Sequence, residues 1–138
     1  MGCNSCGTGL VTPKTLVIGS DDVVNVGLKL QSNGQPLNLS PYFTPGGDVI
    51  ACIQNADGMT ASKFSWSATG GNFPSQIIAD APDCGSFHIN VTANASSGWA
   101  PNDSADINLE LRTPTGGKRI LVLSGVVAIV APTVAGLP

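Results

Sequence analysis

Hydrophobic and polar residues alternate along much of the chain with a period of two. In residues 24–30 the apolar side chains fall on even positions, and in residues 87–91 and 107–111 they fall on odd positions. Successive side chains of a β-strand point to opposite faces, so this pattern predicts strands with one buried face. No segment sustains the 3.6-residue period of an amphipathic helix. Further strands are expected at 36–39, 49–54, 60–68, 75–79 and 118–130, the last with a bulge or kink at Gly125.

Turn-forming residues separate the expected strands. Asn33-Gly34 tolerates the positive φ angles of a type I′ turn and predicts a tight hairpin. Residues 94–104 are polar and predict a connection with room for one helical turn around Trp99. About eight short strands with turns between them predict an all-β fold, a single antiparallel β-sandwich. Other turns or loops are expected at 40–47, 55–58, 80–83 and 113–117.

The domain organisation follows from the same pattern. A chain of 138 residues fits one domain, and we expect the sandwich to span residues 14–131. Residues 1–13 and 132–138 lack periodicity and are expected to be short flexible tails. The content of 17 Gly and 10 Pro residues excludes a long helical bundle. The longest apolar stretch, 120–130, is too short to span a bilayer, so we expect no membrane association and synthesis in a cytosol.

Composition excludes several function classes. Six basic residues stand against nine acidic ones, which argues against a nucleic-acid-binding protein. The only histidine, His88, is expected to point to solvent from the middle of a strand and not to be catalytic. The pairs Asp21-Asp22 and Asp80/Asp83 could hold Ca²⁺, but neither matches a spaced calcium loop. We expect these carboxylates to satisfy turn amides instead, and we expect no enzyme activity, metal or cofactor.

The four cysteines leave alternatives open. Cys3-x-x-Cys6 is half of a zinc or redox motif, but no second close pair completes it. We expect two thiols in the N-terminal tail and two buried core cysteines, Cys52 and Cys84. A disulfide within the tail, an intersubunit disulfide, or a Cys52–Cys84 disulfide in a secreted adhesion domain are the alternatives.

The two tryptophans have different expected roles. Trp66 is in phase with Phe64, so it is expected in the core. Trp99 lies in the polar connection, where it could cap the sandwich, meet a partner or stack on a sugar ring.

The order of turn motifs resembles a known viral module. Residues 19–22 (GSDD) precede a strand, 33–36 (NGQP) lead into 37–40 (LNLS), and 83–89 (DCGSFHI) precede a polar connection and the closing strand. This arrangement, over about residues 17–130, resembles the N-terminal immunoglobulin-like domain of phage baseplate upper proteins and related modules of phage heads and tails. Asn38 stands where that family often has Asp, and no fibre or receptor-binding region follows residue 138, so a direct host-receptor role is not expected.

The resemblance implies an immunoglobulin-like sandwich of about 7–9 strands and a non-enzymatic virion structural protein. It would decorate the capsid or dock on the tail, neck or baseplate in several copies, after assembly in the bacterial cytoplasm. Its partners would be other virion proteins, with no nucleic acid and no membrane. The alternative is a small carbohydrate- or cell-surface-binding module. The candidate partner contacts are Cys3, Cys6, Leu10, Trp99, Val134 and Leu137.

Overall fold

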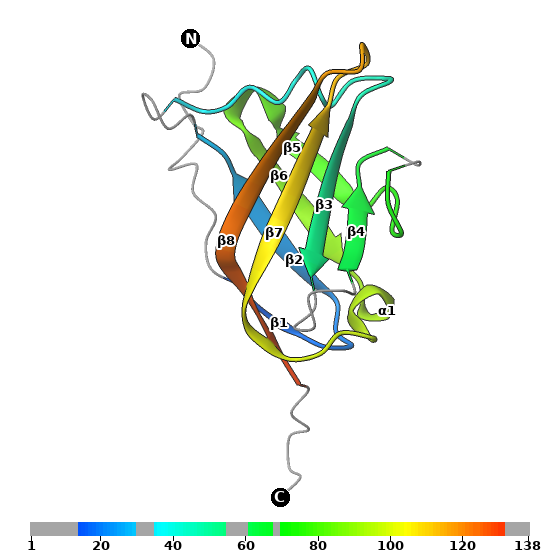
Figure 1. Cartoon of the computed structure of the whole chain (residues 1–138), viewed down its shortest axis with the longest axis vertical. Helices are drawn as coiled ribbons and strands as arrows, with labels where there is room; N and C mark the ends of the chain where they lie inside the picture. The colour runs from blue at the N-terminus through cyan, green and yellow to red at the C-terminus, as the bar shows by residue number, and fades with distance from the viewer. Residues whose placement is uncertain (1–13, 30–34, 55–60, 68–69, 132–138) are drawn as a thin grey trace, which may run out of the picture.

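The structure, a computed structural model, describes residues 14–29, 35–54, 61–67 and 70–131. Nearly all of the regular structure in these ranges is β (Figure 1). The strands are β1 (Lys14–Val17), β2 (Asp22–Gly27), β3 (Asp48–Gln54), β4 (Ala61–Ser65), β5 (Ile77–Ala81), β6 (Ser86–Val91), β7 (Asn102–Arg112) and β8 (Lys118–Val130). The helical elements are the single 3₁₀ turn η1 (Pro82–Cys84) and the short helix α1 (Ala93–Ser96).

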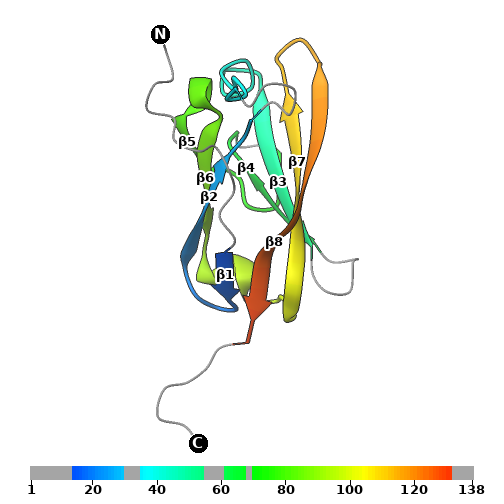
Figure 2. The same cartoon turned by 90° about the vertical axis from the view of Figure 1, so that its left-hand side faces the viewer.

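The strands form two sheets that pack face to face (Figure 2). One sheet has the order β1-β8-β7-β3-β4, and the other has the order β2-β6-β5. The expectation of an all-β sandwich is therefore confirmed. The expectation of a purely antiparallel fold is wrong, because β1 and β8 run parallel in the register Lys14↔Val127 to Val17↔Val130. A parallel pair needs a long connection, and here nearly the whole sandwich lies between the two strands.

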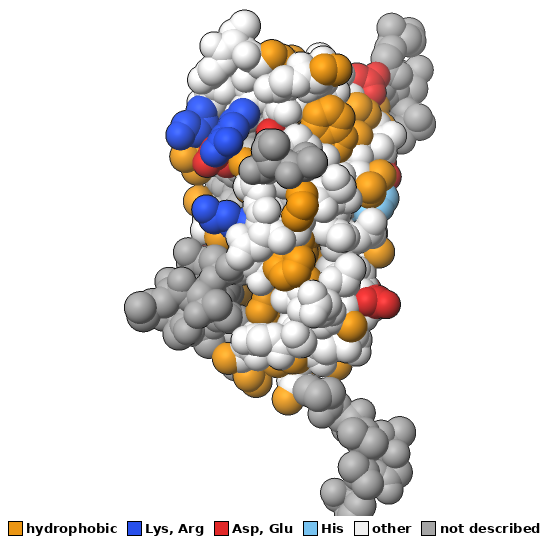
Figure 3. All heavy atoms as spheres, turned by 90° about the vertical axis from the view of Figure 1, so that its right-hand side faces the viewer, with side chains coloured by type: hydrophobic (Ala, Val, Ile, Leu, Met, Phe, Trp, Pro, Cys, Tyr) orange, Lys and Arg blue, Asp and Glu red, His pale blue; other side chains and the backbone are white. Residues whose placement is uncertain are grey.

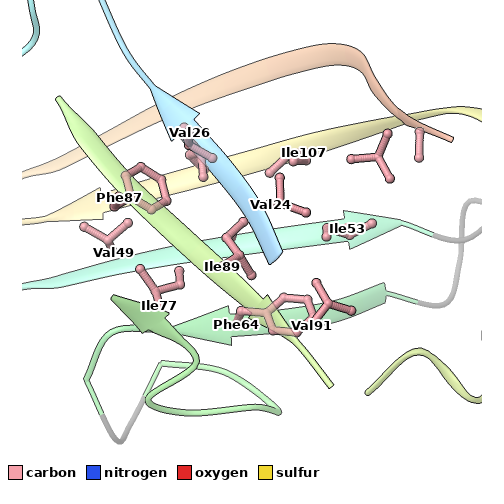
Figure 4. Close-up of a cluster of buried hydrophobic side chains, with 14 of the residues drawn as sticks. Val24, Val26, Val49, Ile53, Phe64, Ile77, Phe87, Ile89, Val91 and Ile107 are labelled. Carbon is pink, nitrogen blue, oxygen red and sulfur yellow. The ribbon is translucent and has the colours of Figure 1, made fainter. Parts of the chain in front are cut away.

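The core lies between the sheets and is filled by the alternating side chains that the sequence pattern indicates. Val24 and Val26 of β2, Phe87 and Ile89 of β6 and Ile107 of β7 are each at most 2% exposed (Figure 4). Burial of each such side chain contributes roughly 1.5–3 kcal/mol. Further core side chains come from β1, β3, β4 and β5: Leu16, Val49, Ile53, Phe64 and Ile77.

Four local expectations need correction. β1 is a strand that the pattern did not predict, and residues 36–39 form only an isolated bridge, Lys29↔Pro36, in place of a strand. β7 begins at Asn102, inside the expected connection, and Asp80 belongs to β5 instead of a turn. Pairing with a neighbouring strand extends β7 and β5 beyond the residues that favour a strand by themselves. The Asn33-Gly34 turn and the turn at 55–58 lie outside the described residues.

The β7–β8 hairpin sets the register of the exposed end of β8. The Gly116 N–H donates to the Thr113 carbonyl at 3.1 Å, and the Thr113 N–H donates to the Gly117 carbonyl at 2.9 Å. Gly116 has φ +97°, so this is a type I turn followed by a glycine bulge. Farther along, Ala105 pairs with Val127 but Ile107 pairs with Leu123. β8 therefore carries extra residues around Gly125, and the predicted bulge is confirmed.

Candidate docking surface on strand β8

Within the described ranges, β8 is paired along both edges over only part of its length. β7 runs along one edge, whereas β1 covers the other edge from Val127 to Val130. Figure 2 shows β1 beside the lower part of β8 only. Among the described residues, no strand pairs with this second edge over residues 118–124. An uncovered edge can template pairing with another strand, so this is the first place to look for a partner.

The outer face of the same segment is apolar. Ile120 and Val122 are 64% and 55% exposed, more than any other large hydrophobic side chain in the described ranges. On the neighbouring strand β7, Glu110 lies opposite Ile120 and Asn108 lies opposite Val122. Glu110 also forms an ion pair with Arg112. A pair of adjacent apolar side chains bordered by charged and polar groups is typical of a contact site with another surface.

A groove of ≈ 430 Å³ lies at the open edge of β8. One wall comes from the inward-facing side of β8, and the opposite wall comes from the chain beyond β2 and from Leu37. Six aliphatic and two cationic residues line it: Leu28, Leu37, Ile120, Leu121, Val122 and Leu123, with Lys29 and Arg119.

The face seen in Figure 3, from the side of β4, is different. Hydrophobic side chains on it are separated by polar atoms, and a few Lys and Arg side chains gather at the upper left. The hydrophobic atoms drawn on this face lie in several small groups.

Cys52 lies on the outer face of β3 and borders a hollow of ≈ 180 Å³ together with Lys63 and Ile120. It is a free thiol of intermediate exposure, so the expectation that it lies in the core is wrong. It faces outward because the inward positions of β3 are Val49, Ala51 and Ile53. Burial raises the pKa of the Cys52 thiol, and the nearby Lys63 ammonium opposes this in part.

Cys84 is buried at the end of η1, as expected, but it is not a free thiol. It is disulfide-bonded, and because Cys52 is free, the two do not bond to each other. The alternative of a Cys52–Cys84 disulfide is therefore wrong. Cys3 and Cys6 lie outside the described residues.

A buried carboxylate that sequence reasoning missed organises the chain after β4. Asp48 is 5% exposed, and its Oδ1 accepts hydrogen bonds from the N–H groups of Val49 and Ser67 at 2.8 and 2.9 Å. Oδ2 accepts from the Ser67 hydroxyl at 2.7 Å and lies 3.0 Å from the Ser65 hydroxyl. A Cβ at Gly70 would collide with this carboxylate. The only sequence signal was an acidic residue at the start of an apolar strand.

His88 has a carboxylate partner that the linear pattern did not show. Its Nδ1 lies 2.9 Å from both carboxylate oxygens of Asp80 on the neighbouring strand β5, on the outer face of the smaller sheet. In the part of the chain that the structure describes, no hydroxyl or thiol hydrogen-bonds to His88. The pair lacks the nucleophile that a catalytic triad requires.

The other acidic pair serves the backbone and β1. Asp21 Oδ1 accepts from the Ala93 N–H at 2.6 Å, at the start of α1, and Asp22 forms a 2.8 Å ion pair with Lys14. The hydrogen bond from Lys14 lowers the pKa of Asp22. Within the described ranges, no three His, Cys, Asp or Glu side chains group as a metal site.

The tryptophans pack as parts of the sandwich. Trp99 is only 7% exposed, and its indole N–H donates to the Ser62 hydroxyl at 2.7 Å. This position agrees with capping and leaves little of the ring for a sugar or a partner. Trp66 packs against the core edge-on to Phe43, with ring centroids 5.6 Å apart.

The remaining candidate contacts, Cys3, Cys6, Leu10, Val134 and Leu137, lie outside the described residues. No helix in the described ranges has the length and apolar character needed to cross a membrane. Comparison of the chain with models of known families, with curated proteins and with solved structures gives no match. The class that the structure defines is an all-β protein of two packed sheets.

Proposed function

We propose that this protein is a non-enzymatic structural component of a bacteriophage particle, an immunoglobulin-like module that docks on other virion proteins. The observation that carries the docking role is the exposed apolar pair Ile120 and Val122 beside the open edge of β8. The virion setting rests on the resemblance of the turn motifs to phage immunoglobulin-like domains. Its site of action would be the capsid surface, neck, tail or baseplate.

The strand order supports the immunoglobulin-like part of the proposal. In that fold, strands B, E and D form one sheet, and G, F and C form the other. The orders β2-β6-β5 and β8-β7-β3 follow this arrangement when the strands are lettered A to G with one extra strand, β4, after C. β1 then takes the place of the first strand, beside the last one.

The chemistry of the described surface favours binding over catalysis. The most exposed large side chains are aliphatic, and the one histidine–carboxylate pair lacks a hydrogen-bonded nucleophile. Contact through apolar area and backbone groups suits a protein that assembles beside many neighbours. The carbohydrate-binding alternative used Trp99 together with His88 and loop Asp residues, and the ring of Trp99 is buried.

Quantitative mass spectrometry of purified particles from the host that encodes the chain tests the setting. Roughly hundreds of copies per particle indicate capsid decoration, and about six to a few tens indicate the neck, tail or baseplate. Absence from particles would remove the virion proposal.

Variants test the docking face. We expect I120S/V122S to incorporate at least about tenfold less than the wild type, since apolar anchors dominate binding energy. The matched control is Ile78→Ser, which changes a 40% exposed isoleucine on the other sheet and should incorporate normally. Equal incorporation of both variants would contradict a docking role for β8.

A further inference from the structure

Cationic side chains lie next to the exposed apolar pair Ile120 and Val122. Lys118 and Arg119 come directly before Ile120 on β8, and Arg112 of β7 lies opposite Lys118. All three cations are exposed. Figure 1 looks onto this outer face of the larger sheet, and no described helix or strand lies over β7 and β8 on that side. The apolar pair and the cations are therefore open to a partner together.

A fourth cation borders the same area from the side of β4. Lys63 lies opposite Cys52 on β3, Cys52 lies opposite Asn108 on β7, and Asn108 lies opposite Val122. Three strand spacings separate the ends of this row, which is about 14 Å across the face. Lys63 is exposed and lines the ≈ 180 Å³ hollow together with Ile120. Cations therefore stand on two sides of an aliphatic centre.

The acidic side chains near this face do not neutralise all of these cations. The carboxylate of Glu110 is held in the ion pair with Arg112. Asp48, which lies opposite Arg112 on β3, is 5% exposed, and its carboxylate accepts a hydrogen bond from the Ser67 hydroxyl. Asp106 is exposed, but it lies in the middle of β7, several residues from Arg112. The end of the face that carries the β7–β8 hairpin is therefore positively charged.

The charge of this face is opposite to that of the whole chain. The formal net charge is −3, with six Lys and Arg residues against nine Asp and Glu residues. Four of the six cations lie on or beside the outer face of the larger sheet: Lys63, Arg112, Lys118 and Arg119. The carboxylates in or next to the smaller sheet are Asp21, Asp22, Asp80 and Asp83. In Figure 3 the Lys and Arg side chains lie on one side of the molecule. Such an asymmetry selects partners of complementary charge.

We propose that the outer face around Ile120 and Val122 binds an acidic surface of another virion protein. That surface has aliphatic side chains at its centre and Asp or Glu carboxylates opposite Lys63, Lys118 and Arg119. The inference rests on the proposed docking function and adds the chemistry of the partner. The charge complementarity between a cationic face and an acidic partner is the observation that selects this occupant.

The two kinds of side chain have different roles in this contact. Ile120 and Val122 form the centre that loses water, and such anchors supply most of the binding energy. The cations at the rim remain partly hydrated, so they act mainly on orientation and on the rate of association. The aliphatic centre favours a protein over a nucleic acid, because contacts with a phosphate backbone do not bury aliphatic side chains.

The rate at which the purified chain binds particles assembled without it tests the role of charge. We expect this rate to fall at least about tenfold between roughly 50 and 500 mM NaCl, because salt screens the attraction. Lys63→Gln and Lys118→Gln should each bind about threefold more slowly at the lower salt concentration and depend less on salt. Lys14→Gln is the matched control, because it removes the same charge from β1, and it should bind like the wild type.

Carbodiimide cross-linking of intact particles, followed by mass spectrometry, identifies the groups in contact. The reagent joins a lysine amine to a neighbouring carboxylate through an amide bond. We expect Lys63 or Lys118 to be linked to an Asp or Glu residue of another virion protein. The Lys14–Asp22 pair, with Nζ and Oδ1 2.8 Å apart, provides an internal positive control for the reaction.

Three results would overturn the proposal. The first is a binding rate that does not depend on salt, together with a normal rate for both lysine variants. The second is cross-links of Lys63 and Lys118 only to other copies of this chain, which would assign the face to self-association. The third is release of the chain from particles by nuclease, which would assign the face to a nucleic acid. If I120S/V122S still fails to incorporate in any of these cases, the docking function stands and only the acidic partner is refuted.

Discussion

The Asp48 cluster offers a sharp test of the packing argument, because the buried carboxylate there is held by hydrogen bonds from neighbouring N–H and hydroxyl groups. The change is Asp48→Ala. It removes the acceptor of the N–H groups of Val49 and Ser67 and of the Ser67 hydroxyl, three donors in all. The Ser65 hydroxyl keeps a second acceptor, the Ser67 carbonyl at 2.6 Å, so it stays hydrogen-bonded in this variant.

The magnitude follows from those three donors. An unsatisfied buried donor costs roughly 1–3 kcal/mol, and the lower end, about 1 kcal/mol per donor, applies because Ser67 lies near the surface. We expect Asp48→Ala to lower the free energy of unfolding by about 3–4 kcal/mol. At this chain length that corresponds to a melting temperature about 10–15 °C lower. Asp48→Asn keeps one carbonyl oxygen and an equal shape, so it should lose only about 1–2 kcal/mol.

Urea unfolding monitored by tryptophan fluorescence measures these differences, because Trp66 and Trp99 both pack against the sandwich. Lys63→Ala on the adjacent strand is the control, and it should change stability by no more than about 0.5 kcal/mol. A loss below about 1 kcal/mol for Asp48→Ala, or equal losses for the alanine and asparagine variants, would refute the reasoning.

Three further predictions concern single side chains. Burial raises the pKa of the Cys52 thiol, so the stability that the neutral thiol contributes is present below about pH 9 and is lost as pH rises through the folded-state pKa. Alkylation of Cys52 by iodoacetamide should therefore be slower in the native protein than in the urea-unfolded protein. The ion pair with Lys14 lowers the pKa of Asp22, so the stability that the Asp22 carboxylate contributes is present above pH 3.8 and is lost on further acidification. Asp22→Asn should remove this contribution, at most about 1 kcal/mol, from the pH dependence of the free energy of unfolding measured with urea. A double-mutant cycle of Trp99→Phe with Ser62→Ala should give a coupling of about 1 kcal/mol, and additive effects would mean that the 2.7 Å hydrogen bond does not contribute.

Much of the fold could be predicted from the sequence because the relevant signals are local. The apolar positions of β2, β6 and β7 alternate within each strand, and these side chains are the ones buried between the sheets. The β7–β8 turn and the bulge near Gly125 are also local, since they depend on glycine and its immediate neighbours. The short helix before Trp99 was also predicted, because the polar connection that signals it is a local feature of the sequence.

The candidate surface was less predictable. Ile120 and Val122 belong to an apolar run in which no alternation marks an inward face. Which of these side chains is exposed depends on the register with β7, and that register depends on the hairpin. The tail residues predicted as partner contacts lie outside the described part of the chain. Trp99 is buried because its ring packs in the core and its indole N–H donates to the Ser62 hydroxyl.

The sequence by itself determined that the chain is all-β and which face of each alternating strand is buried, because a period of two is a property of neighbouring residues. Only the tertiary structure decided the pairings between distant residues. Parallel β1 beside β8, Asp48 with Ser67 and His88 with Asp80 all join groups whose meeting depends on strand order and register. The open edge of β8 has the same origin, since an edge is defined by which strands are neighbours.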